Sequence, residues 1–176
     1  MNNTPLTNFA AAAESYIAFI DSFANARPDK LYTALESHLA DLHAAILPVF
    51  FDTNDPEQPK LEAIGMSHEQ WKTIASLLKD FTSNESEQLY KWHEECWKTA
   101  NPNDNYCAIR ASMLWDDLAD IYHDLHPGLT LWKLDTPESK IEASWRWRFN
   151  FDSHWGNHLF RASTTVHEIR YHLYRD

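Results

Sequence analysis

Residues that favour a protein interior recur at intervals of three and four positions through most of this chain. Such spacing places them on one face of an α-helix, because the helix completes a turn every 3.6 residues. The pattern predicts an all-α fold, a single-domain bundle of about five main helices. The interior positions of the five stretches are Phe9, Ala13, Tyr16, Ile20 and Phe23; Leu35, Leu39, Leu42, Ile46 and Val49; Trp71, Ile74, Leu78 and Phe81; Leu114, Leu118, Ile121 and Leu125; and Phe151, Trp155, His158, Ala162, Val166, Ile169 and Leu173.

Residues that start and stop helices set the limits of these stretches. Pro28 suits the first turn of the second helix, and the short link to the first helix predicts an antiparallel pair. Ser67 opens a capping box with Gln70 at the third helix. The fourth helix is predicted from about residue 105 to 126, because the proline-glycine dipeptide that follows is a strong terminator.

Two segments lack a helical period and are predicted to be irregular. Residues 50–66 hold two prolines and several turn-forming residues. Residues 82–104 fit either a short helix or an ordered loop. Both segments are expected inside one helical domain that spans residues 1–176, because no internal repeat or low-complexity tract divides the chain.

The last helix is predicted to begin at Thr136, with Pro137 in its first turn, and to run nearly to the C-terminus. Within it, residues 145–151 alternate apolar and polar side chains, which is typical of a strand. A helix is preferred, because the cap at Thr136 is strong and no partner strand is evident nearby. Gly156 indicates a local kink or the close approach of another backbone.

This last helix is apolar on two faces. Trp147 and Phe151 fall on one side, whereas Trp145 and Phe149 lie on nearly the opposite side. Such a helix is either central in its bundle or carries a patch for a partner, and a central position is predicted. The candidate aromatic contacts for a partner or ligand are Trp145, Phe149 and Trp155.

Charge and composition narrow the range of partners. The 176 residues include 26 acidic and 15 basic side chains, for a net charge of -11. Nucleic-acid binding needs a basic surface, so a nucleic-acid partner is not expected. No signal peptide or membrane-spanning run is evident, and Cys96 and Cys107 fit reduced thiols in a cytoplasmic protein. A protein is the expected partner.

The candidate chemistry lies in five polar residues from two helices. Asp117, Asp120 and Asp124 follow the edge of the apolar face of the fourth helix. His158 occupies an interior position of the last helix, and His154 lies one turn earlier at the edge of the same face. A carboxylate that borders the core needs a partner, and an imidazole from the neighbouring helix supplies one. These residues are therefore predicted to form an inter-helix polar network.

On the leading interpretation of these five residues, no cofactor is expected. The alternative interpretation is that they form a site for a divalent metal ion. Two histidines four positions apart point the same way and can share an ion. Asp120 and Asp124 are also one turn apart, so Asp120, Asp124, His154 and His158 are the candidate ligands. Trp155 stands where zinc proteases of the H-E-x-x-H type carry their glutamate, so that chemistry is not predicted.

Two segments together resemble the family grouped as domain of unknown function (DUF) 5063. They are "DDLADIYHDLHPGLTLW" and "WRWRFNFDSHWGNHLFRA", in the C-terminal third of the chain, while the N-terminal helices match by pattern only. The resemblance implies a bacterial, soluble, helical protein and confers no activity. The positions that it marks are Asp117, Asp120, Tyr122, Asp124, Trp147, His154, Trp155, Gly156 and His158.

The sequence favours a non-enzymatic function. An acidic surface, abundant aromatic residues and the lack of an intact catalytic motif are typical of a protein-interaction module, such as an adaptor, an immunity-type protein or a regulatory partner. The alternative is a metal-dependent enzyme or a small-ligand-binding bundle that uses the inter-helix histidines and aspartates.

Overall fold

The described residues fold into helices and a two-stranded hairpin. The computed structural model describes residues 4–23, 28–50, 61, 65–86, 91–98 and 105–173. None of the described helices combines the length and the apolar character needed to span a membrane. The elements are α1 (Thr4–Asp21), α2 (Pro28–Ile46), α3 (His68–Ser86), β1 (Lys91–Lys98), β2 (Asn105–Ser112), α4 (Leu114–Trp132), α5 (Pro137–Asn150), the π-helical segment η3 (Phe151–Trp155) and α6 (Gly156–Leu173).

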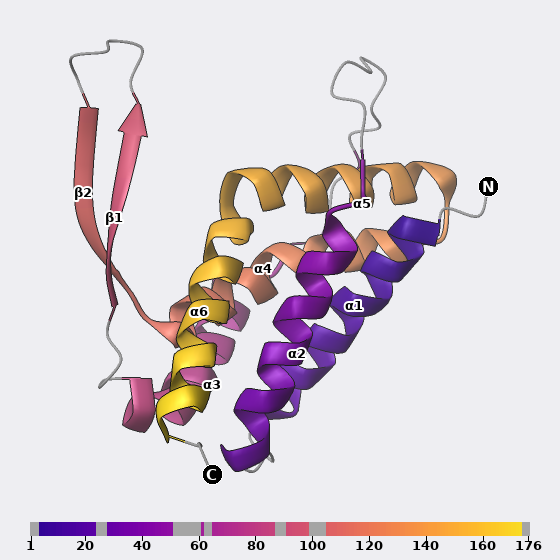
Figure 1. Ribbon diagram of the computed structural model, residues 1–176. Coiled ribbons are helices and arrows are strands. Elements are labelled where there is room, and N and C mark those ends of the chain that lie inside the picture. The colour runs from indigo at the N-terminus through magenta and orange to yellow at the C-terminus, as the bar shows by residue number, and fades with distance from the viewer. Residues whose placement is uncertain are drawn as a thin grey trace.

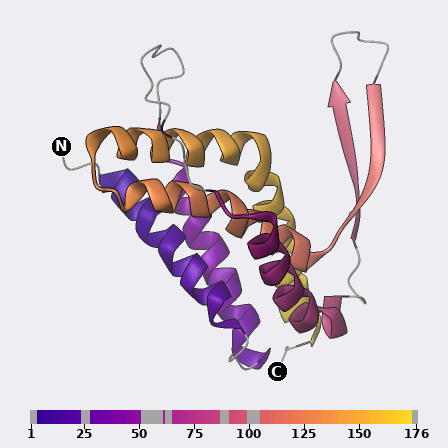
Figure 2. The same cartoon turned by 180° about the vertical axis from the view of Figure 1, so that it is seen from behind.

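The helices form a bundle in which α4 takes the central place. α1 and α2 lie side by side and antiparallel, as predicted from their short link (Figure 1). α4 packs against α1, α3, α5 and α6, whereas α6 packs against α4 and α2. The view from behind shows α3 beside α4 (Figure 2). The all-α, single-domain prediction is confirmed, but the predicted central position of the last helix belongs to α4.

The predicted interior positions form the core. Apolar side chains removed from water stabilise the fold by about 25 cal/mol per Å² of buried area, so the helical stripes turn inward. α3 buries less of its predicted stripe than the other helices do. Among the described positions of that stripe, Leu78 is fully buried, whereas Trp71 and Ile74 are partly exposed. The predicted positions with 0% exposure are Phe9, Ala13, Tyr16, Ile20, Phe23, Leu35, Leu39, Leu42, Ile46, Leu78, Leu118, Ile121, Leu125, Trp155, Ala162, Val166 and Ile169.

The limits of α4 differ from the prediction at both ends. The helix begins later than residue 105 and continues through Pro127 instead of ending before it. A proline removes one backbone donor from a helix, but tertiary contacts hold this turn. The Trp147 indole donates its Nε1 hydrogen to the Leu125 carbonyl at 3.1 Å, and a Cβ at Gly128 would lie 2.1 Å from that nitrogen. The close packing of α5 explains why the proline-glycine dipeptide does not end the helix.

A β-hairpin occupies part of the region predicted to be irregular or helical. Residues 82–86 continue α3, and β1 pairs antiparallel with β2 from Lys91↔Ser112 to Lys98↔Asn105. The prediction of a helix from residue 105 is wrong at its start, because strand pairing joins separate segments and local periodicity does not report it. The loop predicted at residues 50–66 lies largely outside the described residues.

The predicted last helix is two helices joined by a bend. η3 turns the chain from α5 into α6, which leaves α5 at a steep angle (Figure 1). Thr136 is the N-cap as predicted, and its hydroxyl accepts the Ser139 amide at 3.1 Å. Residues 145–151 are helical despite their alternating pattern. Because the chain bends at η3, no single C-terminal helix passes through the middle of the bundle.

Candidate functional site

Side chains from α4 and from the η3–α6 junction meet across one seam of the bundle. Asp117, Asp120 and Asp124 belong to α4, His154 belongs to η3, and His158 belongs to the first turn of α6. Each histidine contacts at least one of these aspartates. The structure therefore brings together all five residues that the sequence singled out.

Carboxylates hold both imidazoles at their Nδ1 atoms. His154 Nδ1 lies 2.7 Å from Asp124 Oδ2, and His158 Nδ1 lies 2.8 Å from Asp117 Oδ1. An ionised carboxylate only accepts hydrogen bonds, so an imidazole that pairs with it donates from Nδ1. That tautomer leaves Nε2 as an acceptor, which is the state in which a histidine binds a metal ion.

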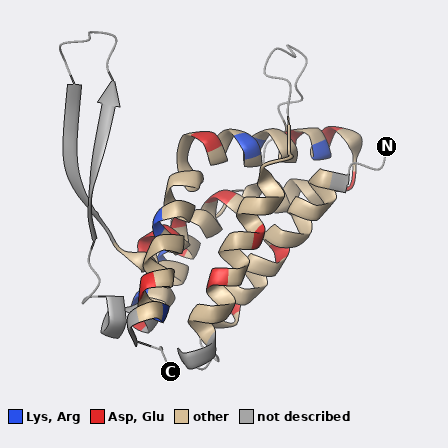
Figure 3. Cartoon of the chain, viewed as in Figure 1, with Lys and Arg blue, Asp and Glu red and all other residues tan. Residues whose placement is uncertain are grey.

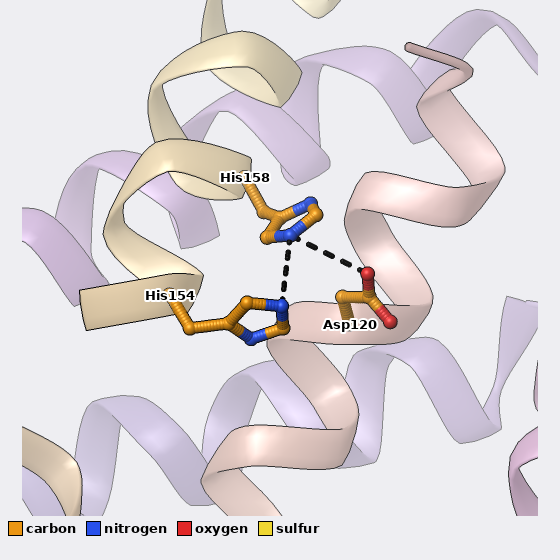
Figure 4. A group of neighbouring side chains, drawn as sticks. All are labelled: Asp120, His154 and His158. Carbon is orange, nitrogen blue, oxygen red and sulfur yellow. Dashed lines mark hydrogen bonds and ion pairs between the residues drawn. The ribbon is translucent and has the colours of Figure 1, made fainter. Parts of the chain in front are cut away.

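Three atoms that can bind a metal ion, one each from His154, His158 and Asp120, converge in the seam (Figure 4). His158 Nε2 lies 3.3 Å from His154 Nε2 and 3.4 Å from Asp120 Oδ2, and ligand atoms of all three residues lie within 4.8 Å of one another. Ligand atoms at about 2.0–2.1 Å from a tetrahedral ion lie about 3.3 Å apart, so this spacing suits a single transition-metal ion. It is the only such group in the part of the chain that the structure describes.

Arg161 completes the inner side of the seam. Its Nε donates to Asp117 Oδ1 at 3.0 Å, and its Nη2 lies 2.9 Å from His158 Nδ1. The second contact favours the other tautomer of His158, in which Nε2 carries a hydrogen that faces His154 and Asp120. A metal ion at His158 Nε2 requires the first tautomer, in which Nδ1 carries the hydrogen and donates it to Asp117.

Asp120 is oriented by a contact that sequence reasoning missed. Trp71 of α3 donates its indole N–H to Asp120 Oδ1 at 3.3 Å, while Asp120 Oδ2 faces the histidines. The sequence placed Trp71 in the apolar stripe of its own helix, and the two residues are 49 positions apart. No local pattern links them, because the contact depends on how α3 packs against α4.

The site is buried on the α4 side and open at His154. Asp117 and Asp124 are 1% and 8% exposed, whereas the His154 side chain is 51% exposed. Asp117 Oδ2 is buried and has no hydrogen-bond partner among the described residues. A buried carboxylate requires a compensating positive charge or hydrogen bonds. An ion at this site would be bound next to buried residues of α4 and would be accessible to solvent on the side of His154.

Negative charge is concentrated around the seam. Burial raises the pKa of Asp116, and the neighbouring Asp120 and Asp117 carboxylates raise it further. A hydrogen bond to Asp124 raises the pKa of His123, so the charged form of this imidazole is favoured. Acidic positions are spread over α1, α2, α4 and α5 as well (Figure 3). Crowded carboxylates favour the binding of a cation between them.

Asp124 orients His154 and does not face the converging atoms. The sequence made it a candidate ligand, but its Oδ2 is bonded to His154 Nδ1 and its Oδ1 lies 3.5 Å from His123 Nδ1. Asp124 therefore contacts Nδ1 of His154, whereas Nε2 of the same ring faces Asp120. Carboxylates in this position orient the imidazole and raise its basicity in metal sites. Three of the four candidate ligands converge, and the fourth positions one of them.

The π-helical segment sets the direction of the His154 side chain. The Gly156 N–H donates to the Phe151 carbonyl, five residues earlier, which widens the turn by one residue relative to an α-helix. A Cβ at Gly156 would lie 2.4 Å from that carbonyl oxygen, so a larger residue does not fit without a backbone shift. Of the two possibilities that the sequence left open at Gly156, a local kink or the close approach of another backbone, the structure shows the kink.

The three candidate partner aromatics separate into surface and core. Trp145 and Phe149 of α5 stack with ring centroids 4.8 Å apart, and Phe149 is 46% exposed. Trp155 is 0% exposed, and its indole donates to the Trp147 carbonyl at 3.1 Å. The prediction that Trp155 contacts a partner is therefore wrong, because its ring lies in the core, where the spacing of the apolar stripe places it.

Similarity to known proteins supports the fold. The sequence matches the family described as "Domain of unknown function (DUF5063)" over residues 2–172. Among solved structures, the crystal structure of protein BF1032 from Bacteroides fragilis is similar, with a TM-score of 0.73 and 17% sequence identity. That match covers 97% of this chain and 94% of the other chain. None of the curated proteins matches this sequence.

Proposed function

This chain belongs to the DUF5063 family, and we propose that it binds one divalent transition-metal ion through His154, His158 and Asp120. The observation that carries the proposal is the convergence of two Nε2 atoms and one carboxylate oxygen, separated by 3.3 and 3.4 Å. Both imidazoles also have a carboxylate at Nδ1, from Asp124 and Asp117. A carboxylate at the Nδ1 of each histidine is typical of metal sites, whereas a pair of solvated surface histidines does not require one.

The ligand set favours an ion that keeps open coordination positions. Two histidines and one carboxylate supply three ligands, and zinc sites with three protein ligands hold water at the fourth position. The exposed side of His154 would place that water toward solvent. Zinc lowers the pKa of a bound water to about 7, which creates a nucleophile at neutral pH. The geometry therefore supports a metal-dependent enzyme of the hydrolytic type best, with iron(II) as the competing ion for this ligand set.

Metal titration tests the proposal. Protein purified without a histidine tag and stripped with a chelator is expected to bind one equivalent of Zn²⁺ by calorimetry and to melt at a higher temperature. Binding should weaken as the pH falls, because protons compete for the imidazoles. Asp120→Ala and His154→Ala are expected to lose binding. The matched control is His167→Ala, which removes an exposed histidine bound to Glu36 outside the seam and should bind normally.

Two results would contradict the metal site. Wild-type protein could bind less than about half an equivalent of Zn²⁺, Fe²⁺ or Co²⁺, with a melting temperature that the chelator leaves unchanged. Alternatively, the Asp120→Ala, His154→Ala and His167→Ala variants could all bind as wild type does. The first result would leave the seam as a structural network, and the second would place the ion elsewhere in the chain.

A protein-interaction role is the second proposal, supported by one surface of α5. Ile141 and Phe149 are 52% and 46% exposed, and Trp145 stacks on Phe149. These residues are four positions apart and form an apolar stripe, a feature that is enriched in binding surfaces. A partner captured by wild-type protein should be lost with Phe149→Ser and retained with Leu134→Ser, another exposed apolar position. Capture that Phe149→Ser leaves unchanged would exclude this surface.

A further inference from the structure

The two cysteines occupy opposite positions in the hairpin. The strand register pairs Cys96 of β1 with Cys107 of β2. Directly opposed residues of antiparallel strands have Cα atoms about 4.5 or 5.5 Å apart, depending on the hydrogen-bond pattern. Disulfides span Cα separations of about 4.4–6.8 Å. Paired positions also share one face of the ribbon, because successive residues of a strand alternate between faces. The backbone register thus places both cysteines within disulfide range.

The hairpin has little support from the rest of the fold. β1 and β2 form a two-stranded sheet, and the backbone of each strand lies mainly beside that of the other. Both ribbon views show the strands standing away from the helices over most of their length (Figures 1 and 2). A two-stranded hairpin is marginally stable in water without further packing. A covalent link between the strands would supply the constraint that packing does not.

We propose that Cys96 and Cys107 form an intramolecular disulfide that fastens β1 to β2. The oxidant is a low-molecular-weight disulfide such as oxidised glutathione. One cysteine thiolate attacks a sulfur of the oxidant, forms a mixed disulfide and releases one glutathione thiolate. The second cysteine thiolate attacks the protein sulfur of the mixed disulfide and releases the other glutathione. Two protein thiols are oxidised, and one glutathione disulfide is reduced to two thiols.

This bond makes the hairpin respond to redox conditions. The disulfide joins the residues on either side of segment 97–106. This link reduces the conformations available to the strands when they are not paired, so it favours the paired state. β2 leads almost directly into α4, which begins at Leu114 and carries the aspartates of the seam. Under reducing conditions the two cysteines are expected to be thiols, as the sequence predicts. Oxidation converts the same pair to the proposed disulfide. The proposal is independent of the metal site, because neither cysteine belongs to it.

Disulfide mapping of the full chain tests the proposal. After incubation with oxidised glutathione and denaturation, iodoacetamide is expected to modify no cysteine before reduction and both cysteines after it. Trypsin cleavage after Lys98 should give two peptides that stay linked until they are reduced. Amide hydrogen exchange in both strands should slow about tenfold or more on oxidation. Glutathione adducts on both cysteines, or disulfides formed only between two chains, would overturn the proposal.

A matched control moves one cysteine to the other face of β1. In the double variant Cys96→Ser/Glu95→Cys, position 95 pairs with Ala108 and lies on the face opposite to Cys107. This variant is expected to accumulate glutathione adducts instead of an internal disulfide. Internal cross-linking as fast as in wild type would show that the register does not bring the pair together, and it would also overturn the proposal.

Discussion

The His158→Ala variant is expected to lose Zn²⁺ binding and to unfold more easily even without metal. The His158 side chain is 12% exposed, so truncation leaves a small void. It also removes the imidazole that pairs with Asp117, which is 1% exposed. Together these effects should lower the free energy of unfolding by about 1–3 kcal/mol. Urea denaturation of chelator-treated protein measures this loss, and calorimetry measures Zn²⁺ binding.

The His154→Ala variant separates the two roles. Its side chain is 51% exposed and Asp124 keeps His123 Nδ1 at 3.5 Å, so its removal should abolish metal binding and cost less free energy of unfolding than His158→Ala. If His158→Ala leaves the free energy of unfolding unchanged, the imidazole does not stabilise the buried Asp117 carboxylate. If it leaves Zn²⁺ binding unchanged, His158 is not a ligand and the proposed site is wrong.

The Gly156→Ala variant is expected to lose about 1–3 kcal/mol of stability and to bind metal more weakly. The added Cβ would lie 2.4 Å from the Phe151 carbonyl oxygen, so the backbone of η3 must shift. A shift of the η3 backbone would move His154 relative to Asp120 and Asp124, which belong to the separate helix α4. Urea denaturation and Zn²⁺ titration of the same preparation measure both effects.

Gly65→Ala is the matched control, because a Cβ at this exposed glycine meets no atom within 4 Å. Its stability and metal affinity should equal those of wild type within about 0.5 kcal/mol. Equal stability of the two alanine variants would mean that η3 relaxes at no cost. Unchanged metal affinity in Gly156→Ala would mean that the π turn does not orient His154.

Much of the helical core follows from the sequence. The stripe that contains Phe9, Tyr16 and Ile20 is buried, as its spacing predicts, because these residues share the face of α1 that packs against the bundle. Thr136 caps α5 for the same local reason, since its hydroxyl lies within one turn of the amide that it accepts. The alternating segment 145–151 is helical because this cap and the flanking interior positions outweigh a short strand-like pattern.

Where the prediction failed, contacts between distant segments decided the structure. β2 replaces the start of the predicted fourth helix, because its partner β1 lies in a segment with no readable period. α4 continues through Pro127, because Trp147 packs on that turn. The predicted last helix bends at η3 and divides into α5 and α6, which leaves α4 as the central helix.

The sequence by itself determined the helical bundle and the two sets of polar residues that face its seam. Helical period is a local property, so it places Asp120 and His158 at the edge or interior of their own helices. Tertiary structure alone decided which atoms meet. The bend at η3 turns both Nε2 atoms toward Asp120, Asp124 is left behind His154, and Trp71 arrives from α3. Side-chain convergence depends on the angle and register between packed helices, and no single helix encodes these.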